Sequence, residues 1–263
     1  GRDAAAIVAA AAEGALGGLV VGGVDPADLP DPALAHRALT SVGFLVSLEV
    51  RSSAVTQHAD VVLPVAPPVE KAGTFLNWEG RPRPFPQALT STAMADHRVL
   101  DAVADAMGVL LGLRSVSQVH AEVAQLGGWD GARGAAPEVA YAEPPRLGAG
   151  EAVLASWHLL LDGGRCQDGE RFLAGTAQRP VLRLSAGHAA ELGVGTGDAV
   201  TVRTDRGQVT LPLVVTPMPD GVVWLPLHST GSTVRPTLGV DAGTVVRVQP
   251  AALAVAANDG EGQ

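Results

Sequence analysis

The side chains with the most chemical potential lie in the segment from Gly73 to Arg81. Asn77, Glu79 and Arg81 place an amide, a carboxylate and a guanidinium at alternate positions after Gly73 and Thr74. Glycine lets backbone approach a ligand closely and a guanidinium donates in a fork, so this set could clamp a phosphate or a guanine edge. Networked charges are often structural, however. We favour the interpretation that the loop is locked by its own hydrogen bonds and an ion pair.

The histidines and the single cysteine do not predict a second site. The 7 histidines are dispersed, and none pairs with another at zinc-ligand spacing. A lone histidine such as His228 is more often a satisfied structural side chain than a ligand. Cys166 can form no internal disulfide, which indicates a reducing compartment, and one thiolate cannot hold an iron–sulfur cluster. With no catalytic motif in the sequence either, we predict no catalytic residue and no metal ligand.

The elements before and after Gly73–Arg81 alternate between helical and strand periodicity. That spacing is typical of βαβ units and predicts a parallel sheet. Residues 65–93 are proline-rich and are predicted to be irregular. The predicted helices are Ala4–Glu13, Pro32–Leu39, Ser52–Ala59, Asp96–Leu111 and one from a Ser115/Gln118 capping box to Gly127; the predicted strands are Gly17–Gly23, Phe44–Val50 and Asp60–Pro64.

The chain changes character after residues 128–150, which are rich in Gly, Pro, Ala and Arg. Many short strands with one small helix, Ala186–Leu192, predict a compact β-barrel. We therefore expect an α/β domain over 1–135, a linker over 136–150 and a barrel with a C-terminal tail over 151–263. The predicted strands are Val153–Leu161, Val181–Leu184, Ala199–Thr204, Gln208–Thr216, Val222–Pro226 and Thr244–Val248, with hairpin turns at 205–207 and 219–221.

Composition excludes several classes of protein. Hydrophobic residues make up 47% of the 263 residues and charged residues 17%, which is globular. The net charge of -9 and the absence of a basic run argue against nucleic-acid binding. No apolar run reaches the roughly 20 residues that span a bilayer, so we expect no direct membrane insertion. The chain begins Gly-Arg-Asp directly on a predicted helix, and we expect it to be an N-terminally incomplete fragment.

Two stretches resemble the molybdopterin oxidoreductase family. Ala59–Pro64 followed by Glu70–Arg81 is similar to the family pattern A-D-V-V-L-P … E-x-x-G-T-x-x-N-x-E-G-R. Leu184–Pro226 is similar to the family's C-terminal dinucleotide-binding domain. The resemblance implies an α/β parallel-sheet (Rossmann-like) domain followed by a double-psi β-barrel of the molybdopterin dinucleotide-binding type.

Within this family, residues 70–81 look most like the large iron–sulfur subunits, or G subunits, of bacterial NADH–quinone oxidoreductases. Trp157–Gly163 and Leu227–Ser232 look like the actinobacterial type. The resemblance implies a structural, non-catalytic region of a complex that passes electrons from NADH to quinone and translocates protons. It also implies iron–sulfur clusters in a preceding part of the parent protein, partners in the peripheral arm of complex I, and a place on the cytoplasmic face of the inner membrane.

The cofactor of the active family is not expected in this segment. Active relatives continue Arg-x-Gln, whereas Pro82, Pro84 and Pro86 follow Arg81 here and remove three backbone donors. The residues that the resemblance places near the former cofactor site are vestigial candidates only: Gly73, Thr74, Asn77, Glu79, Arg81 and His228. Two alternatives remain open, namely an active molybdopterin enzyme such as a formate dehydrogenase or nitrate reductase, and a free-standing interaction module built on the barrel.

Overall fold

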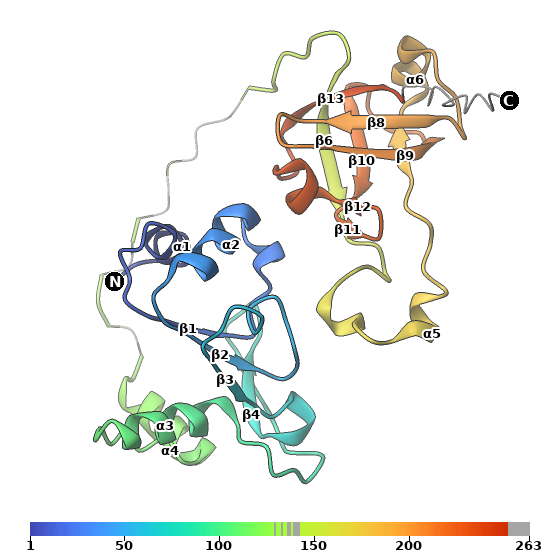
Figure 1. Cartoon of the computed structure of the whole chain (residues 1–263). Coiled ribbons are helices and arrows are strands. Elements are labelled where there is room, and N and C mark those ends of the chain that lie inside the picture. The colour runs from blue at the N-terminus through green and yellow to red at the C-terminus, as the bar shows by residue number, and fades with distance from the viewer. Residues whose placement is uncertain (129, 133, 136–137, 139–142, 252–263) are drawn as a thin grey trace, which may run out of the picture. The chain divides into compact units, whose positions relative to one another are not determined.

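The computed structural model describes residues 1–128, 130–132, 134, 135, 138 and 143–251 (Figure 1). The chain divides into two compact units. The first comprises Gly1–Pro26 with Leu34–Ala140, and the second comprises Ala27–Ala33 with Tyr141–Gln263. Within these described ranges, no helix has the length and apolar character needed to cross a bilayer.

A three-stranded parallel sheet forms the centre of the first unit, as predicted from the alternating elements. Its strands β1 (Leu19–Gly22), β2 (Leu45–Glu49) and β3 (Val61–Pro64) lie in the order β1-β2-β3. On one face Leu45 packs with Leu39 and Val55, and on the other Leu48 packs with Val65 and Val99. The central strand is therefore covered on both faces, as is usual for parallel strands.

Four helices accompany this sheet: α1 (Ala4–Ala12), α2 (Pro32–Ser41), α3 (Asp96–Ala106) and α4 (Val116–Gln125). The Ser115 cap of α4 is confirmed, because its hydroxyl accepts from the Gln118 N–H at 3.2 Å. The predicted extension of α3 to Leu111 is wrong. The helix ends at Ala106 with Met107 as its C-cap, and Gly108 turns the chain with φ +78°, a left-handed conformation that suits glycine. Leu110 is consequently 83% exposed.

The helix predicted at Ser52–Ala59 is also wrong, because residues 54–58 form turns. The Ser53 N–H donates to the Thr56 hydroxyl at 2.8 Å, and that hydroxyl donates back to the Ser53 carbonyl at 2.9 Å. Local side-chain bonds of this kind compete with helical bonding. Val55 is fully buried beneath the turn and anchors it.

The proline-rich stretch is more regular than predicted. After the short helix η2 (Pro68–Glu70), strands β4 (Gly73–Leu76) and β5 (Pro82–Phe85) form an antiparallel hairpin. The many prolines predicted an irregular loop, but prolines at alternate positions are compatible with the edge of a hairpin. This hairpin carries most of the candidate site.

The second unit is a closed barrel of six strands, which confirms the barrel prediction (Figure 1). The strand order is β10-β6-β13-β8-β9-β7, with parallel pairs β10·β6 and β7·β9 and antiparallel pairs elsewhere. Inward-facing Val and Leu side chains fill it, including the fully buried Leu182, Leu184, Leu213 and Leu225. The strands are β6 (Glu151–Trp157), β7 (Leu182–Leu184), β8 (Ala199–Arg203), β9 (Gln208–Val215), β10 (Val222–Pro226) and β13 (Val245–Pro250).

Smaller elements connect the barrel strands. Helix α6 (Ala186–Leu192) has Ser185 as its N-cap and Gly193, at φ +68°, as its C-terminal stop, as predicted. Residues 219–221 turn the chain but do not form a hairpin, since β9 and β10 are not paired. The remaining elements are η3 (Arg165–Gln167), α5 (Arg171–Ala174), β11 (His228–Ser229), β12 (Ser232–Thr233) and the π-helical turn η4 (Val234–Leu238).

A short segment from the first half of the chain belongs to the barrel unit, which the sequence did not predict. This segment, 27–33, follows the start of the 3₁₀ turn η1 (Pro26–Asp28). The Arg206 guanidinium lies 3.2 Å from the Asp31 carboxylate. The Arg235 guanidinium donates to the Asp28 carbonyl at 3.0 Å. The expected linker, 136–150, lies partly outside the described residues, and the tail beyond 251 lies wholly outside them.

Candidate functional site

The hairpin loop between β4 and β5 is held by its own polar groups. The Asn77 side-chain oxygen accepts from the N–H groups of Glu79 at 3.1 Å and Arg81 at 2.8 Å. The Arg81 Nε lies 3.2 Å from the Glu79 carboxylate, with the two side chains 62% and 37% exposed. Gly80 closes the turn at φ +77°. The loop is thus an internally bonded turn with an ion pair at the surface.

The prolines after Arg81 leave the hairpin ladder intact. The Asn77 N–H donates to the Arg81 carbonyl at 3.1 Å, so this is a hydrogen-bonded pair. Bonded and non-bonded pairs alternate along an antiparallel ladder. Pro82 and Pro84, opposite Leu76 and Thr74, therefore occupy non-bonded pairs. Their missing N–H groups would have pointed away from β4, so the prolines cost the hairpin no ladder bond and remove only outward-facing donors.

The two faces of the hairpin differ. On one face Phe75 and Phe85 stack with ring centroids 4.8 Å apart. Gly73 suits this packing, because a Cβ at this position would lie 2.7 Å from the Phe85 ring and the ring would have to shift. This glycine thus leaves room for the Phe85 ring.

The opposite face lines a groove of about 580 Å³ against helix α4. Within it the Thr74 hydroxyl and His120 Nε2 lie 2.9 Å apart. Burial, followed by the nearby Arg98 cation, lowers the pKa of His97 below its usual value. The sequence did not reveal this groove, because its walls come from separate elements. They are Ala72, Gly73, Thr74, Leu76, Pro82, Pro84, His97, Val116, Val119, His120, Val123 and Ala124.

His228 lies in the second unit and has a backbone partner. Its Nε2 is 2.9 Å from the Gly163 carbonyl oxygen. Close by, His158 Nδ1 lies 2.7 Å from the Asp162 carboxylate, which also accepts from the Gly164 N–H at 2.8 Å. Burial alone would raise the pKa of Asp162, but the Gly164 N–H and the His158 contact lower it below the usual value. His228 therefore helps to fix the loop at 162–164.

The described part of the chain holds no group of three or more His, Cys, Asp or Glu side chains arranged to bind a metal ion. Cys166 is exposed in η3. The neighbouring Arg165 pairs with Asp168 at 2.9 Å, so its cation is engaged there.

A molybdopterin cofactor would need donors that converge on it from free side chains. The acceptor of Asn77 serves its own loop, Arg81 Nε faces Glu79, and His228 Nε2 faces a carbonyl. Thr74 is bonded to His120. These atoms are thus engaged within their own loops or by neighbouring side chains, and no chemical step through a pterin follows from them.

Two domain families match the sequence. Residues 3–104 match the molybdopterin oxidoreductase family, and residues 165–258 match the molydopterin dinucleotide binding domain. Among solved structures, acetylene hydratase from Pelobacter acetylenicus aligns with a TM-score of 0.60 at 16% identity, over 94% of this chain and 46% of that one. At that identity the similarity concerns fold alone.

Curated relatives give a narrower match. The NADH-quinone oxidoreductase G subunit of Mycobacterium tuberculosis is 55% identical over 252 residues, covering 94% of this chain and 31% of the relative. The Streptomyces coelicolor G subunit is 53% identical over 263 residues, covering 98% and 31%. A putative formate dehydrogenase of Bacillus subtilis is 37% identical over only 93 residues, covering 35% and 10%.

The chain thus spans about a third of the length of the G subunits it matches. Its similarity to them extends over almost all of its own residues and through both family domains. The chain is thus similar over most of its length to the G subunits of NADH-quinone oxidoreductases, and its two separate matches, over 3–104 and 165–258, are both to domains of molybdopterin proteins.

Proposed function

We propose that this chain is a segment of the G subunit of a bacterial NADH–quinone oxidoreductase, and that the segment is structural. The observation that carries the proposal is 55% identity over 252 residues. The parent complex would pass electrons from NADH to quinone and couple this to proton translocation. Iron–sulfur clusters would lie elsewhere in the parent protein, and its partners would be other proteins of the peripheral arm at the cytoplasmic face of the membrane.

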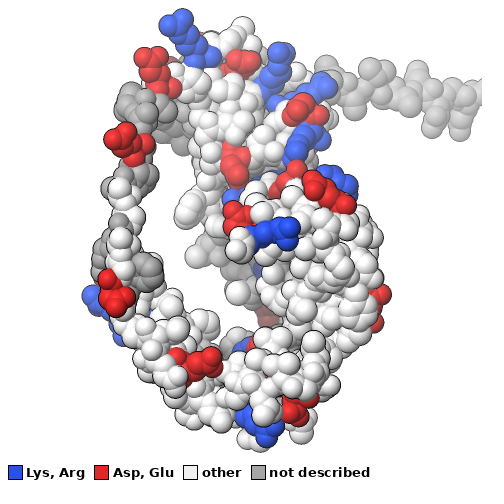
Figure 2. Space-filling view, turned by 90° about the vertical axis from the view of Figure 1, so that its left-hand side faces the viewer, with Lys and Arg blue, Asp and Glu red and all other residues white. Residues whose placement is uncertain are grey.

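The engaged polar groups support a structural role. The vestigial candidates Asn77, Glu79, Arg81 and His228 stabilise their own loops. We propose that no molybdenum, tungsten or pterin is bound, and that the two units stiffen the parent protein while clusters elsewhere carry electrons. We also propose no role in nucleic-acid binding. Acidic and basic side chains lie interspersed on the face shown in Figure 2.

The finer architecture is part of the same proposal. The parallel sheet covered on both faces supports a Rossmann-like domain within 1–135. The two parallel strand pairs, β6·β10 and β7·β9, within a six-stranded closed barrel support a double-psi barrel within 151–263. Residues 136–150 would act as the linker between the two domains. Residues 27–33 would belong to the barrel unit.

An active molybdopterin enzyme is the second candidate. The observation that favours it is the match of residues 165–258 to the molydopterin dinucleotide binding domain. The match to a putative formate dehydrogenase points the same way but covers only 35% of the chain. We rank this candidate lower because the higher-identity similarity, over 94–98% of the chain, is to the G subunits.

The proposal is tested by tagging the protein that contains this segment in its native host and purifying it in mild detergent. We expect other peripheral-arm proteins to co-purify with the tagged protein, and we expect the purified sample to have NADH–quinone reductase activity. A matched strain should lack residues 143–263. It should yield less assembled complex, while the activity per iron–sulfur cluster in the remaining complex is unchanged. Normal assembly with loss of activity would contradict a structural role, and molybdenum-dependent formate oxidation by the purified protein would favour the second candidate.

A further inference from the structure

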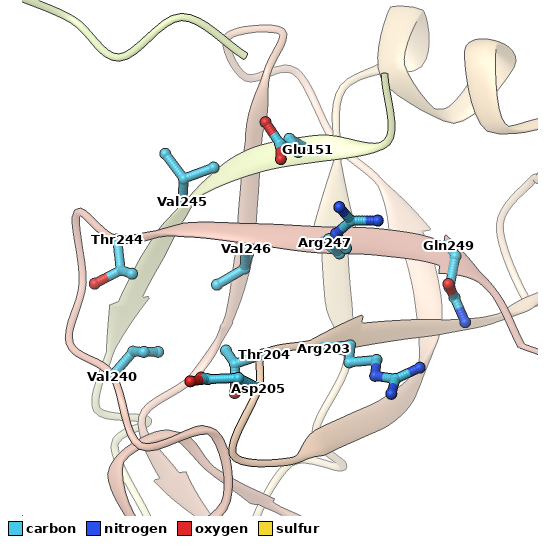
Figure 3. A pocket seen from close by; sticks show the side chains of 10 residues that line it. All are labelled: Glu151, Arg203, Thr204, Asp205, Val240, Thr244, Val245, Val246, Arg247 and Gln249. Atoms are coloured by element: carbon cyan, nitrogen blue, oxygen red, sulfur yellow. The ribbon is translucent and has the colours of Figure 1, made fainter. Parts of the chain in front are cut away.

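A hollow on the outer surface of the barrel carries two arginines at opposed register positions of neighbouring strands. It has a volume of about 600 Å³ and is lined from strands β6, β8 and β13 and the turns beside them (Figure 3). Arg203 on β8 lies directly opposite Arg247 on β13, and both are exposed. Like charges directly opposite one another destabilise a sheet. An anion bound to both guanidiniums would relieve this repulsion.

The acidic groups that the structure describes around the hollow form no ion pair with these two arginines. Glu151 is the register partner of Arg247, but its carboxylate accepts from the Gly148 N–H at 2.9 Å. Asp205 points toward Val240, away from the Arg203 guanidinium (Figure 3). In the described part of the structure, no carboxylate lies within ion-pair distance of either Arg203 or Arg247. Other arginines of this unit do have one: Arg165 with Asp168, Arg206 with Asp31, and Arg235 with Asp241.

The surroundings of the pair suit a protein side chain. Gln249 lies beside Arg203 at the same end of the hollow and offers an amide (Figure 3). At the other end, Val240 and Val245 add apolar surface, next to Asp205 and Thr244. An isolated phosphate would use the two arginines and leave the remaining surface uncovered. A polypeptide with carboxylates for the two arginines and apolar groups beside them would cover both ends.

We propose that this hollow is a docking site for an acidic segment of a protein partner, with Arg203 and Arg247 each receiving a carboxylate. Arginine suits this role because its planar fork binds a carboxylate in bidentate fashion and because arginine is enriched at protein interfaces. The chain as a whole carries a net charge of -9, so a local cationic pair gives an acidic partner a specific place to bind. This docking role does not depend on which complex the chain joins.

The test measures binding of a fluorescein-labelled hexaglutamate peptide to the 263-residue chain by fluorescence anisotropy at low salt. Arg203→Gln/Arg247→Gln should weaken binding by about tenfold or more, because two charge-assisted contacts are lost. The control Arg146→Gln/Arg179→Gln removes the same charge from two exposed arginines outside the hollow and should change affinity by less than about twofold, the size of a screened surface effect. A hexaglutamine peptide should not bind.

Circular dichroism should show all variants folded, since the exchanged side chains are exposed. Equal weakening by the control pair would overturn the proposal in favour of nonspecific attraction. Arginine-dependent binding of inorganic pyrophosphate without binding of the peptide would overturn it in favour of a small phosphate-bearing ligand. Absence of arginine-dependent binding of either probe would also overturn it.

Discussion

Replacing Gly207 with alanine should destabilise the barrel selectively. Gly207 ends the turn between β8 and β9, and a Cβ at this position would lie 2.2 Å from the Thr237 carbonyl oxygen of η4. That oxygen belongs to the backbone, so a side-chain rotation cannot relieve the clash. The turn or η4 must move by roughly 1 Å to restore an ordinary contact distance.

The energetic cost follows from this displacement. Overpacking of a tightly packed contact costs about 1–3 kcal/mol. The Thr204 hydroxyl, which donates to the Leu238 carbonyl at 2.7 Å, would be displaced with the turn. Losing that bond adds roughly 0.5–1.5 kcal/mol. We therefore expect the unfolding free energy of the barrel to fall by about 1.5–4.5 kcal/mol, a drop in Tm on the order of 10 °C or more for a domain of this size.

Urea denaturation followed by circular dichroism measures this change, with Gly195→Ala as the matched control. A Cβ at Gly195 meets only the Asp198 carboxylate at 3.9 Å, so the control should be nearly neutral. The unfolding transition of the first unit should be unaffected by either change. If Gly207→Ala unfolded within about 0.5 kcal/mol of wild type, rigid packing of η4 on this turn would be refuted.

Three further predictions concern the core, the hairpin and pH. Leu213→Ala, at a fully buried position, should destabilise the barrel by about 2–5 kcal/mol in urea, whereas Leu160→Ala, at a position 96% exposed, should be nearly silent. Arg81→Ala should change the unfolding free energy in urea by less than about 1 kcal/mol, because its ion pair with Glu79 is on the surface; a larger loss would mean a buried partner. Asp162 has a lowered pKa in the folded state, so its carboxylate stabilises the fold above its ordinary value near 3.8, and this stabilisation is lost as pH falls through the lower folded value. Asp162→Asn should therefore show a shallower loss of thermal stability on acidification than wild type, and parallel pH curves would contradict the assignment.

The barrel was largely predictable from sequence because its signal is local. Gln208–Val215 alternates exposed and buried positions, with Val209, Leu211 and Leu213 facing inward. Local sequence patterns also predicted the other five barrel strands, with bounds correct to within a few residues. What the local pattern did not contain is the order in which the strands close, or the recruitment of 27–33 into the barrel unit. Both depend on pairings between residues far apart in the chain.

The errors in the first unit have separate physical causes. The helical spacing of apolar residues led to a predicted helix that continued past Gly108, but a left-handed turn at Gly108 stops α3. A helix was predicted at Ser52–Ala59, but hydrogen bonds between the Thr56 hydroxyl and the Ser53 backbone favour turns there. Alternate prolines concealed strand β5.

The candidate loop could be located from its residue types and its resemblance to the family, and its internal bonding was the favoured interpretation. Its geometry was not predictable in full. That the ion pair of Arg81 is exposed depends on the hairpin's position at the surface. The groove against α4 depends on packing between elements more than 30 residues apart, such as Thr74 and His120. The arginine pair of the barrel arises from the register of β8 and β13, which no local pattern specifies.

The metal and pterin content of the purified parent protein tests the proposed structural role most directly. We expect iron from clusters elsewhere in the parent protein, molybdenum and tungsten at the level of the buffer, and no fluorescent pterin after acid oxidation. Molybdenum or tungsten stoichiometric with this chain, together with released pterin, would contradict a structural segment and establish a functioning cofactor site.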